Sequence, residues 1–332
     1  MGPSRSSRAI LVGSLLLASC KRESAPTTSM ATPSTTIQGA VQATTPPRVR
    51  PKPTEPTPER TLAFSYRPVF GDPKAYEMHD AEDQHHILLL RGTERGEAYP
   101  VVVAMHGQPR RGQAPRTYRF PAVVSRVARE GLTQGDLGPF VLVTPVFRFE
   151  GQNWPSFELG PFMTVVYRAL ADAGIAGSGL YIVGHSGAAG CGGAGLNQVA
   201  KLTPNAVGFF DTCVGSGFAQ AVRALAAQRT PTLIVHSVET AGFVPRHALE
   251  YDADFDFGKV YAPLGLKAAT CPEQLPAAPL RSIDYRCAKN DTGSTQAFVV
   301  NTGHGEAAHE ALVPVALRYF LQRYVGRDHS SR

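Results

Sequence analysis

One stretch of the sequence limits the possible folds more than any other: an apolar strand that runs directly into a serine flanked by glycines. Residues 180–183 are apolar or aromatic, which is typical of a central strand buried on both faces. Ser186 follows almost at once, between Gly184 and Gly187. Because neighbours with little or no side chain let the backbone turn sharply, the stretch predicts a strand-to-helix corner that exposes the serine hydroxyl.

Further apolar runs flank this strand along the chain, and segments of helical period separate several of them. Strands that alternate with helices favour an α/β fold, with a mostly parallel, right-handed wound sheet and helices on both faces. The strands are expected at residues 86–90, 99–105, 139–147, 206–211, 232–237 and 296–301, and the helices at 117–131, 160–173, 187–200 and 217–228, with a last helix entered near Pro314.

Residues 184–188, Gly-His-Ser-Gly-Ala, resemble the nucleophile elbow of the α/β-hydrolase superfamily, whose usual pattern is Gly-x-Ser-x-Gly. The chain departs from that pattern at Ala188, where the last glycine is expected. The resemblance covers residues 85–325 and implies an α/β-hydrolase-like sheet. It also implies an esterase-like serine hydrolase that uses Ser186 as its nucleophile, forms an acyl-enzyme and needs no cofactor or metal.

The resemblance also implies an oxyanion hole beside the serine. The run 99–105 leads into His106-Gly107-Gln108. In α/β-hydrolases a His-Gly turn after this early strand supplies one backbone N–H, here that of Gln108, and Gly187 would supply the second. Such donors stabilise the negative oxygen of the tetrahedral intermediate.

A serine hydroxyl needs a base within hydrogen-bonding distance to take its proton. His304 follows the last predicted strand by a few residues, which leaves a loop long enough to reach back over Ser186, so His304 is the favoured base. His309 is the rival. His185 and His236 are expected to be structural.

Two carboxylates compete for the role of the acid that orients the histidine. Glu239 lies just beyond the strand at 232–237, the usual acid position in the family, and is slightly favoured. Asp211 ends the strand before it, a position that some family members use. An aspartate at a strand end is also a common cap, so the sequence leaves the choice open. Either acid preserves the chain order serine, acid, histidine.

The favoured reaction is cleavage of a carboxylic ester, with an amide as the second choice, in a small molecule or a component of the cell envelope. Two non-catalytic alternatives stay open. The same fold could bind a ligand without cleaving it, or it could bind a partner in the envelope.

The first 60 residues predict export and a lipid anchor rather than a folded domain. Residues 1–19 combine arginines, an apolar run and Leu-Ala-Ser before Cys20, which resembles the bacterial lipobox, so Cys20 would carry diacyl lipid with chains such as palmitate. Residues 20–60 are rich in Thr, Ser and Pro and predict a disordered tether. The hydrolase domain is expected at 61–327, with a lid or side-wall insertion at 241–295. This organisation predicts a domain in a bacterial cell envelope, anchored by preference in the outer membrane and facing the periplasm or the cell surface.

The net charge of +6 is concentrated in the amino-terminal segment. Residues 1–60 hold 8 Lys and Arg against 3 Asp and Glu, whereas the rest of the chain holds 25 against 24. A nucleic-acid-binding domain concentrates basic residues on a folded face. The nearly neutral charge of residues 61–332 therefore argues against a nucleic-acid partner. We also expect the protein to be a monomer.

Export into an oxidising compartment favours disulfides among the cysteines that carry no lipid. Cys191 follows the serine corner and Cys213 follows the next strand, so both are expected near adjacent strand ends, where a bridge can form. Cys271 and Cys287 lie together in the insertion and are the second expected pair. A zinc site is disfavoured because the spacing contains no Cys-x-x-Cys unit.

The lipid anchor predicts a simple change in location. Cys20→Ser removes the thiol that would be acylated, so the domain should move from the membrane fraction to the soluble fraction. Mass spectrometry of the mature amino-terminal peptide should find acyl chains in the wild type. Unchanged membrane partition of the variant, with no acyl mass in the wild type, would contradict the prediction.

Overall fold

The computed structural model describes residues 55–65, 84–107, 120–145, 158–189, 195–237, 261–271, 275, 285–300 and 306–326. The chain divides into residues 1–53 and a compact unit that starts at Thr54. The predicted signal segment, Cys20 and most of the tether lie outside the described residues. Within the described ranges, no helix is both long and apolar enough to cross a bilayer.

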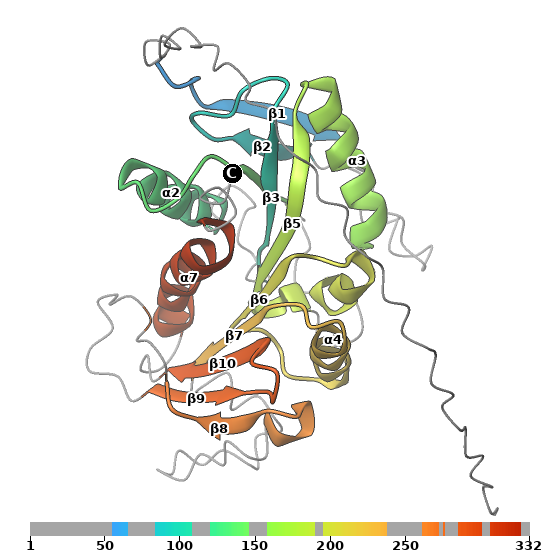
Figure 1. Ribbon diagram of the computed structural model, residues 1–332, viewed down its shortest axis with the longest axis vertical. Coiled ribbons are helices and arrows are strands. Elements are labelled where there is room, and N and C mark those ends of the chain that lie inside the picture. The colour runs from blue at the N-terminus through green and yellow to red at the C-terminus, as the bar shows by residue number, and fades with distance from the viewer. Residues whose placement is uncertain are drawn as a thin grey trace, which may run out of the picture. The chain divides into compact units, whose positions relative to one another are not determined.

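In the described residues, ten strands form one sheet in the order β1-β2-β4-β3-β5-β6-β7-β10-β9-β8 (Figure 1). The strands from β4 to β10 in this order pair in parallel, and the strands at the two ends pair antiparallel. This mostly parallel sheet confirms the predicted α/β-hydrolase-like class. The strands are β1 (Arg60–Ser65), β2 (Gln84–Leu89), β3 (Ala98–Met105), β4 (Val141–Thr144), β5 (Ala176–His185), β6 (Ala206–Phe210), β7 (Thr232–Ser237), β8 (Lys267–Ala269), β9 (Tyr285–Lys289) and β10 (Thr295–Val300).

Helices cover both faces of the sheet, as predicted (Figure 1). One face packs against α3 (Leu159–Asp172), the 3₁₀ helix η3 (Gly195–Leu202) and α4 (Ser216–Ala227). The other face packs against α2 (Phe120–Thr133) and α7 (Glu306–Phe320). Each α-helix buries apolar residues three and four positions apart, which is the stripe that a helix lying on a sheet needs. Shorter helical turns are η2 (Ser186–Ala189), η4 (Ala262–Leu264) and the π-helical η5 (Leu321–Val325).

The central strands are buried on both faces, and their carboxyl ends share one edge. Every residue of β6 and β7 is buried, which explains why apolar residues follow one another in β6 and in the middle of β7 rather than alternating with polar ones. Met105 of β3 pairs with Gly184 of β5, and His185 pairs with Phe210 of β6. The residues that follow β3, β5, β6 and β7 are therefore brought together at the same edge of the sheet.

Three strands at the sheet ends were not predicted from the sequence. β1 pairs antiparallel with β2, and β8 and β9 extend the sheet beyond β10 from within the predicted insertion. β8 has three residues, of which Lys267 and Ala268 are exposed. Such short, half-exposed strands carry no apolar run, so their pairing partners rather than their own pattern decide the structure.

Two helix predictions are corrected by the structure. The last helix was expected to begin near Pro314, but α7 begins at Glu306 and contains Pro314 in its interior. The preceding Glu-Ala-Ala-His-Glu-Ala-Leu is rich in strong helix formers. Pro314 leaves the carbonyl of Glu310 without its helical donor, and because Glu310 is exposed, water can take that place. The helix expected at 187–200 is described as two separate 3₁₀ segments, η2 and η3. Its many glycines disfavour a continuous α-helix.

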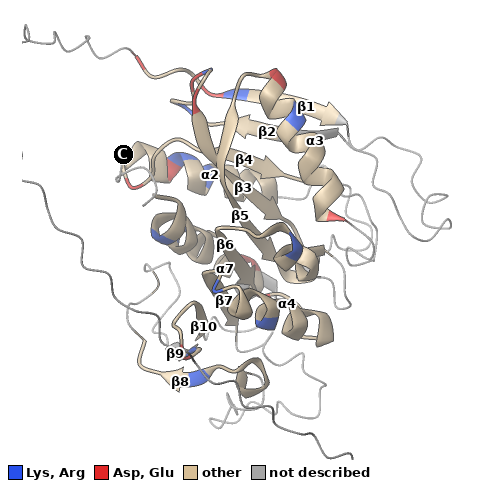
Figure 2. Ribbon diagram, turned by 45° about the vertical axis from the view of Figure 1, so that its right-hand side comes forward, with Lys and Arg blue, Asp and Glu red and all other residues tan. Residues whose placement is uncertain are grey.

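The described unit includes residues that the sequence assigned to the tether. The carboxylate of Glu59 accepts two hydrogen bonds from Arg129 of α2, at 2.9 and 2.7 Å, and the backbone N–H of Gly92 donates to the carbonyl of Thr57. Figure 2 shows Lys, Arg, Asp and Glu interspersed along the described elements. Exposed pairs such as Lys267–Asp291 contribute little to stability.

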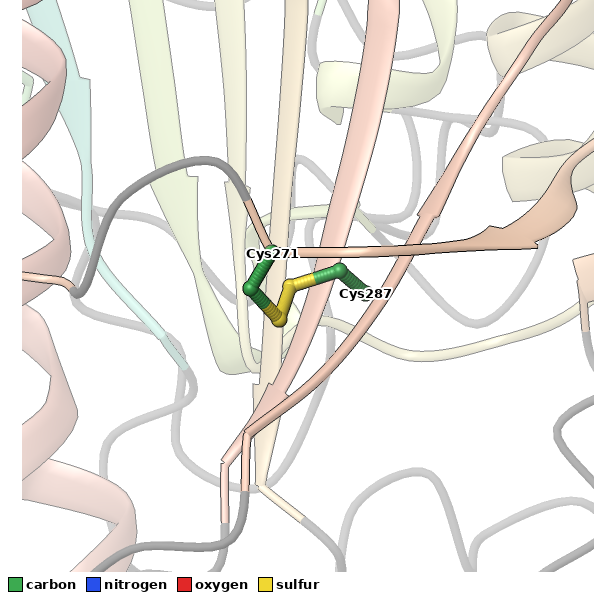
Figure 3. Close-up of a disulfide and its surroundings, with 2 residues drawn as sticks. All are labelled: Cys271 and Cys287. Carbon is green, nitrogen blue, oxygen red and sulfur yellow. A yellow bond between two sulfur atoms is a disulfide. The ribbon is translucent and has the colours of Figure 1, made fainter.

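A disulfide joins the end of the β8 segment to β9. Cys271 and Cys287 are bonded, with a Cα–Cα distance of 5.2 Å (Figure 3), and this confirms the second predicted pair. Cys213 is also disulfide-bonded. Its expected partner, Cys191, lies outside the described residues, so that pairing stays a prediction.

Removing the bridge at the sheet end should lower stability. The two cysteines lie 16 positions apart, and closing a loop of that size stabilises a folded protein by about 3 kcal/mol. We expect Cys271→Ala/Cys287→Ala to lower the free energy of unfolding by that order, measured by urea denaturation. Asp291→Asn, which breaks the exposed ion pair with Lys267 in the same region, should change it by less than about 1 kcal/mol. Equal effects of the two changes would contradict this account.

Candidate active site

The serine stands on a strained corner at the end of β5. Ser186 has a φ of 54°, in the left-handed region that residues with a side chain seldom adopt. Gly184 just before the corner leaves little room for a side chain, because an added Cβ would lie 2.7 Å from a methyl group of Leu196 and 3.0 Å from the Cβ of Ala188. The sequence prediction of a sharp corner with small neighbours therefore has its physical reason in this packing.

The turn after β3 lies directly against the serine. A Cβ built on Gly107 would lie 2.6 Å from the Cβ and 3.1 Å from the Oγ of Ser186. Only a glycine allows the backbone to come this close. The next residue, Gln108, lies outside the described residues, and Gly187 is buried beside the serine.

A buried carboxylate follows β6 and contacts a histidine from α7. Asp211 is 1% exposed and has a φ of 48°, a left-handed conformation that aspartate tolerates better than most residues. Its Oδ2 lies 2.5 Å from Nδ1 of His309. Its Oδ1 accepts hydrogen bonds from the backbone N–H and the hydroxyl of Ser237, at 2.6 and 2.9 Å. The carboxylate is thus held between the end of β7 and α7.

This contact fixes the tautomer of His309. A carboxylate accepts hydrogen bonds, so Nδ1 of His309 carries the proton that it donates to Asp211. Its Nε2 is then the nitrogen that can take a proton from another group. The ring of His309 lies 4.3 Å from the ring of His185, the residue immediately before Ser186. The pair of Asp211 and His309 therefore lies beside the serine corner.

The surroundings of Asp211 favour its ionised form. Burial by itself would raise the pKa of this carboxyl, but the hydrogen bond from His309, the nearby His309 and His236 rings and the N–H of Ser237 lower the pKa below the usual value of an aspartate. Asp211 is therefore ionised at neutral pH, as a residue that orients and stabilises an imidazolium must be.

Three other histidines at this edge are buried and neutral. Burial lowers the pKa of His185 to about 3 and the pKa of His236 to about 4. Burial also lowers the pKa of His106 to about 4, although its Nδ1 donates to the Gly107 carbonyl. The ring of His185 stacks on Phe120 at a centroid distance of 6.0 Å. The expectation that His185 and His236 are structural agrees with this burial.

The described residues contain only part of the predicted site. Ser186, Gly187, Asp211 and Cys213 are described, whereas Gln108, Cys191, Glu239 and His304 are not. Among the described residues, the backbone N–H of Cys213 donates to the carbonyl of Ser186 at 3.4 Å, which ties the loop after β6 to the serine corner. No group of three or more His, Cys, Asp and Glu in the described ranges could hold a metal ion.

Sequence reasoning missed one polar residue of this site. Ser237 was identified only as the last residue of a strand, yet it supplies two of the donors to Asp211. A buried hydroxyl at the end of an apolar strand is a weak signal, because it could equally cap a turn. His309 was the second choice because His304 follows the last predicted strand by a few residues, in a loop long enough to reach back over Ser186.

The comparisons with known proteins find no close relative. No protein-family model matches the sequence, and no curated protein matches it. Among solved structures, a CE1 ferulic acid esterase from Anaeromyces mucronatus is 13% identical and covers 84% of this chain and 94% of its own, with a TM-score of 0.47. A feruloyl esterase module from Clostridium thermocellum is 13% identical over 59% of this chain and 79% of its own, with a TM-score of 0.38. Brefeldin A esterase is 16% identical over 57% of this chain and 63% of its own, with a TM-score of 0.33.

The buried histidines should make the protein sensitive to acid. The folded-state pKa of His185 lies below the unfolded value of about 6.5, so the unfolded chain takes up the proton first as the pH falls. Stability is therefore complete above about pH 6.5 and is lost as the pH falls towards 3, by up to about 1.4 kcal/mol per pH unit for one proton. His185→Phe should flatten the fall in free energy of unfolding between pH 7 and 5, measured by urea denaturation.

The control for this measurement is a buried ring on the other face of the sheet. Phe162 is fully buried and does not titrate, so Phe162→Leu should lower stability equally at both pH values. If His185→Phe keeps the slope of the wild type, burial of this histidine does not contribute to the acid sensitivity.

Proposed function

We propose that the protein is a serine hydrolase in which Ser186, His309 and Asp211 form the catalytic triad. The observation that carries the proposal is the 2.5 Å contact between Asp211 and His309 beside the serine corner. The strained φ of Ser186 and the chain order serine, aspartate, histidine support it.

In the proposed reaction the free Nε2 of His309 takes the proton of the Ser186 hydroxyl as its Oγ attacks the carbonyl carbon of the substrate. The tetrahedral intermediate then expels the alcohol, which receives that proton from His309, and an acyl-enzyme remains. A water molecule, deprotonated by the same nitrogen, releases the acid and restores the serine. Throughout this cycle Asp211 holds the ring and stabilises the imidazolium.

The oxyanion of the intermediate needs donors close to Ser186. We propose the backbone N–H groups of Gly187 and Gln108. The close approach of Gly107 to the serine supports this choice, because it brings the turn after β3 against the nucleophile. Removing one such donor typically lowers turnover by about 10²- to 10³-fold.

The base and the acid favoured by the sequence were His304 and Glu239. Both lie outside the described residues. We propose His309 and Asp211 in their place, because the described contact joins these two residues and because the buried carboxylate has a lowered pKa.

We also propose that the substrate bond is a carboxylic ester, with an amide as the second choice, and that the enzyme acts in a bacterial envelope. The amino-terminal segment before Cys20 supports export, and the Thr- and Pro-rich segment after it supports a tether. Hydrolysis through an acyl-enzyme on serine needs no cofactor. The substrate is then a small ester or an ester group of the envelope.

The proposed triad predicts which variants lose activity. Ser186→Ala and His309→Ala should each lower kcat for p-nitrophenyl esters by about 10⁴- to 10⁶-fold, and the double variant should be little worse, because both residues serve one proton transfer. Asp211→Asn should be milder, at about 10⁴-fold or less. The matched controls His304→Ala and Glu239→Gln should keep kcat within about tenfold of the wild type.

A serine-directed fluorophosphonate gives an independent measurement. It should label the wild type at Ser186 and should not label Ser186→Ala. A folded wild type that neither reacts with the probe nor cleaves any ester or amide would favour the non-catalytic alternative, a ligand-binding or interaction protein of the envelope. If His304→Ala abolishes turnover while His309→Ala does not, the base is His304 and the hydrolase proposal stands.

A further inference from the structure

The end of β7 carries a serine that touches the proposed acid and is not itself a member of the triad. Ser237 is the last residue of β7 and is 2% exposed. It lies 26 positions after Asp211 in the sequence and contacts that residue through both its backbone and its side chain. In α/β-hydrolases the acid usually follows the strand that corresponds to β7. Here the proposed acid, Asp211, follows β6, and the end of β7 supplies hydrogen-bond donors to it.

Three contacts define how Ser237 holds the carboxylate. The backbone N–H of Ser237 donates to Oδ1 of Asp211 at 2.6 Å. The hydroxyl lies 2.9 Å from Oδ1 and also 2.9 Å from Oδ2. A hydroxyl has one proton to donate. Because the hydroxyl oxygen is equally distant from both carboxylate oxygens, this proton is shared between them.

The hydroxyl of Ser237 fixes the rotation of the Asp211 carboxylate about its Cβ–Cγ bond, which the backbone contact alone does not fix. The torsion that rotates a carboxylate about its Cβ–Cγ bond has broad, shallow minima. The N–H of Ser237 holds Oδ1, and its hydroxyl lies 2.9 Å from both Oδ1 and Oδ2. With both in place, the plane of the carboxylate is fixed and Oδ2 meets Nδ1 of His309.

The backbone of Asp211 is held by the same strand. Its N–H donates to the carbonyl of Val235 at 2.7 Å, and its φ of 48° directs the side chain away from the regular strand path. Loss of the Ser237 hydroxyl would leave this contact and the hydrogen bond from the N–H of Ser237 in place. The fold should therefore survive its removal, and the effect should fall on the orientation of the acid.

We propose that Ser237 is a positioning residue, whose hydroxyl fixes the carboxylate plane of Asp211 so that this acid orients His309 for the reaction at Ser186. The inference rests on the proposed serine-hydrolase function. It assigns to the end of β7 a role in turnover that acts through Asp211.

The test is a double-mutant cycle on the full-length protein with p-nitrophenyl acetate as substrate. Ser237→Ala should lower kcat by about tenfold and leave KM unchanged, because a hydrogen bond to a charged group is worth about one factor of ten or more. In an Asp211→Asn background, Ser237→Ala should have no further effect on kcat, since the residue through which it acts has lost its charge.

A matched control comes from the other end of the same strand. Thr232 of β7 is fully buried, and its hydroxyl donates to the carbonyl of Thr230 at 3.0 Å without touching Asp211. Thr232→Val removes a buried hydroxyl while keeping the shape of the side chain. It should lower stability and leave kcat unchanged.

A second measurement does not depend on turnover. A proton shared between Nδ1 of His309 and Asp211 should give a resonance far downfield in the proton NMR spectrum. Ser237→Ala should shift or broaden this resonance, and Thr232→Val should leave it in place. This readout tests the positioning role even if the protein cleaves no ester.

Two kinetic results would overturn the inference while the hydrolase proposal stands. One is a Ser237→Ala variant with the kcat of the wild type. The other is an equal loss of kcat from Ser237→Ala in the wild-type and Asp211→Asn backgrounds, which would mean that the hydroxyl acts only through the fold. The inference is also overturned if the wild type is active and labelled by the probe while the downfield resonance of Ser237→Ala stays at its wild-type position. A wild type without labelling or turnover removes the hydrolase proposal instead, and the resonance alone then decides whether Ser237 positions the Asp211–His309 pair.

Discussion

The structure around the site depends on one buried negative charge. Asp211 is 1% exposed, and an ionised carboxylate in such surroundings is strongly unfavourable unless several donors compensate it. Here the donors come from two elements far apart in the sequence, β7 through Ser237 and α7 through His309. Both donors reach the carboxylate only if β7 has this register in the sheet and α7 begins where it does. The buried charge therefore makes the geometry of the site depend on the fold.

The serine corner adds a second constraint, which is steric rather than electrostatic. A left-handed backbone at a residue with a side chain is unfavourable by about 1–2 kcal/mol, and both Ser186 and Asp211 adopt one. The surrounding strands over-determine these conformations, since β5 and β6 are fully buried next to the corner and Gly107 packs against the serine. The strain therefore persists at the serine corner and at the carboxylate that contacts His309.

The sequence predicts the central sheet well because a parallel strand buried on both faces is apolar along most of its length. β3, β6 and β7 lie within one residue of their expected bounds for this reason. The strands at the sheet ends could not be found in this way, because β8 has only three residues, two of them exposed, and is defined by its pairing with β9. Pro314 misled the assignment of α7, since a proline inside a helix leaves one carbonyl without a donor, and this is tolerated where that carbonyl belongs to an exposed turn.

In the site, as in the sheet, some features follow from a local sequence pattern and others depend on contacts between distant segments of the chain. The serine corner is a local pattern of small residues around one hydroxyl, so the sequence indicates it. Whether the proposed acid is Asp211 or Glu239, and the proposed base His309 or His304, depends on which strand end the histidine reaches, and for His309 this follows from where α7 begins. Because α7 starts at Glu306, His309 lies in its first turns, and its Nδ1 meets the carboxylate at the end of β6. Ser237 at the end of β7 then donates to Asp211 at the end of the neighbouring strand, an arrangement that the pairing of β6 with β7 creates.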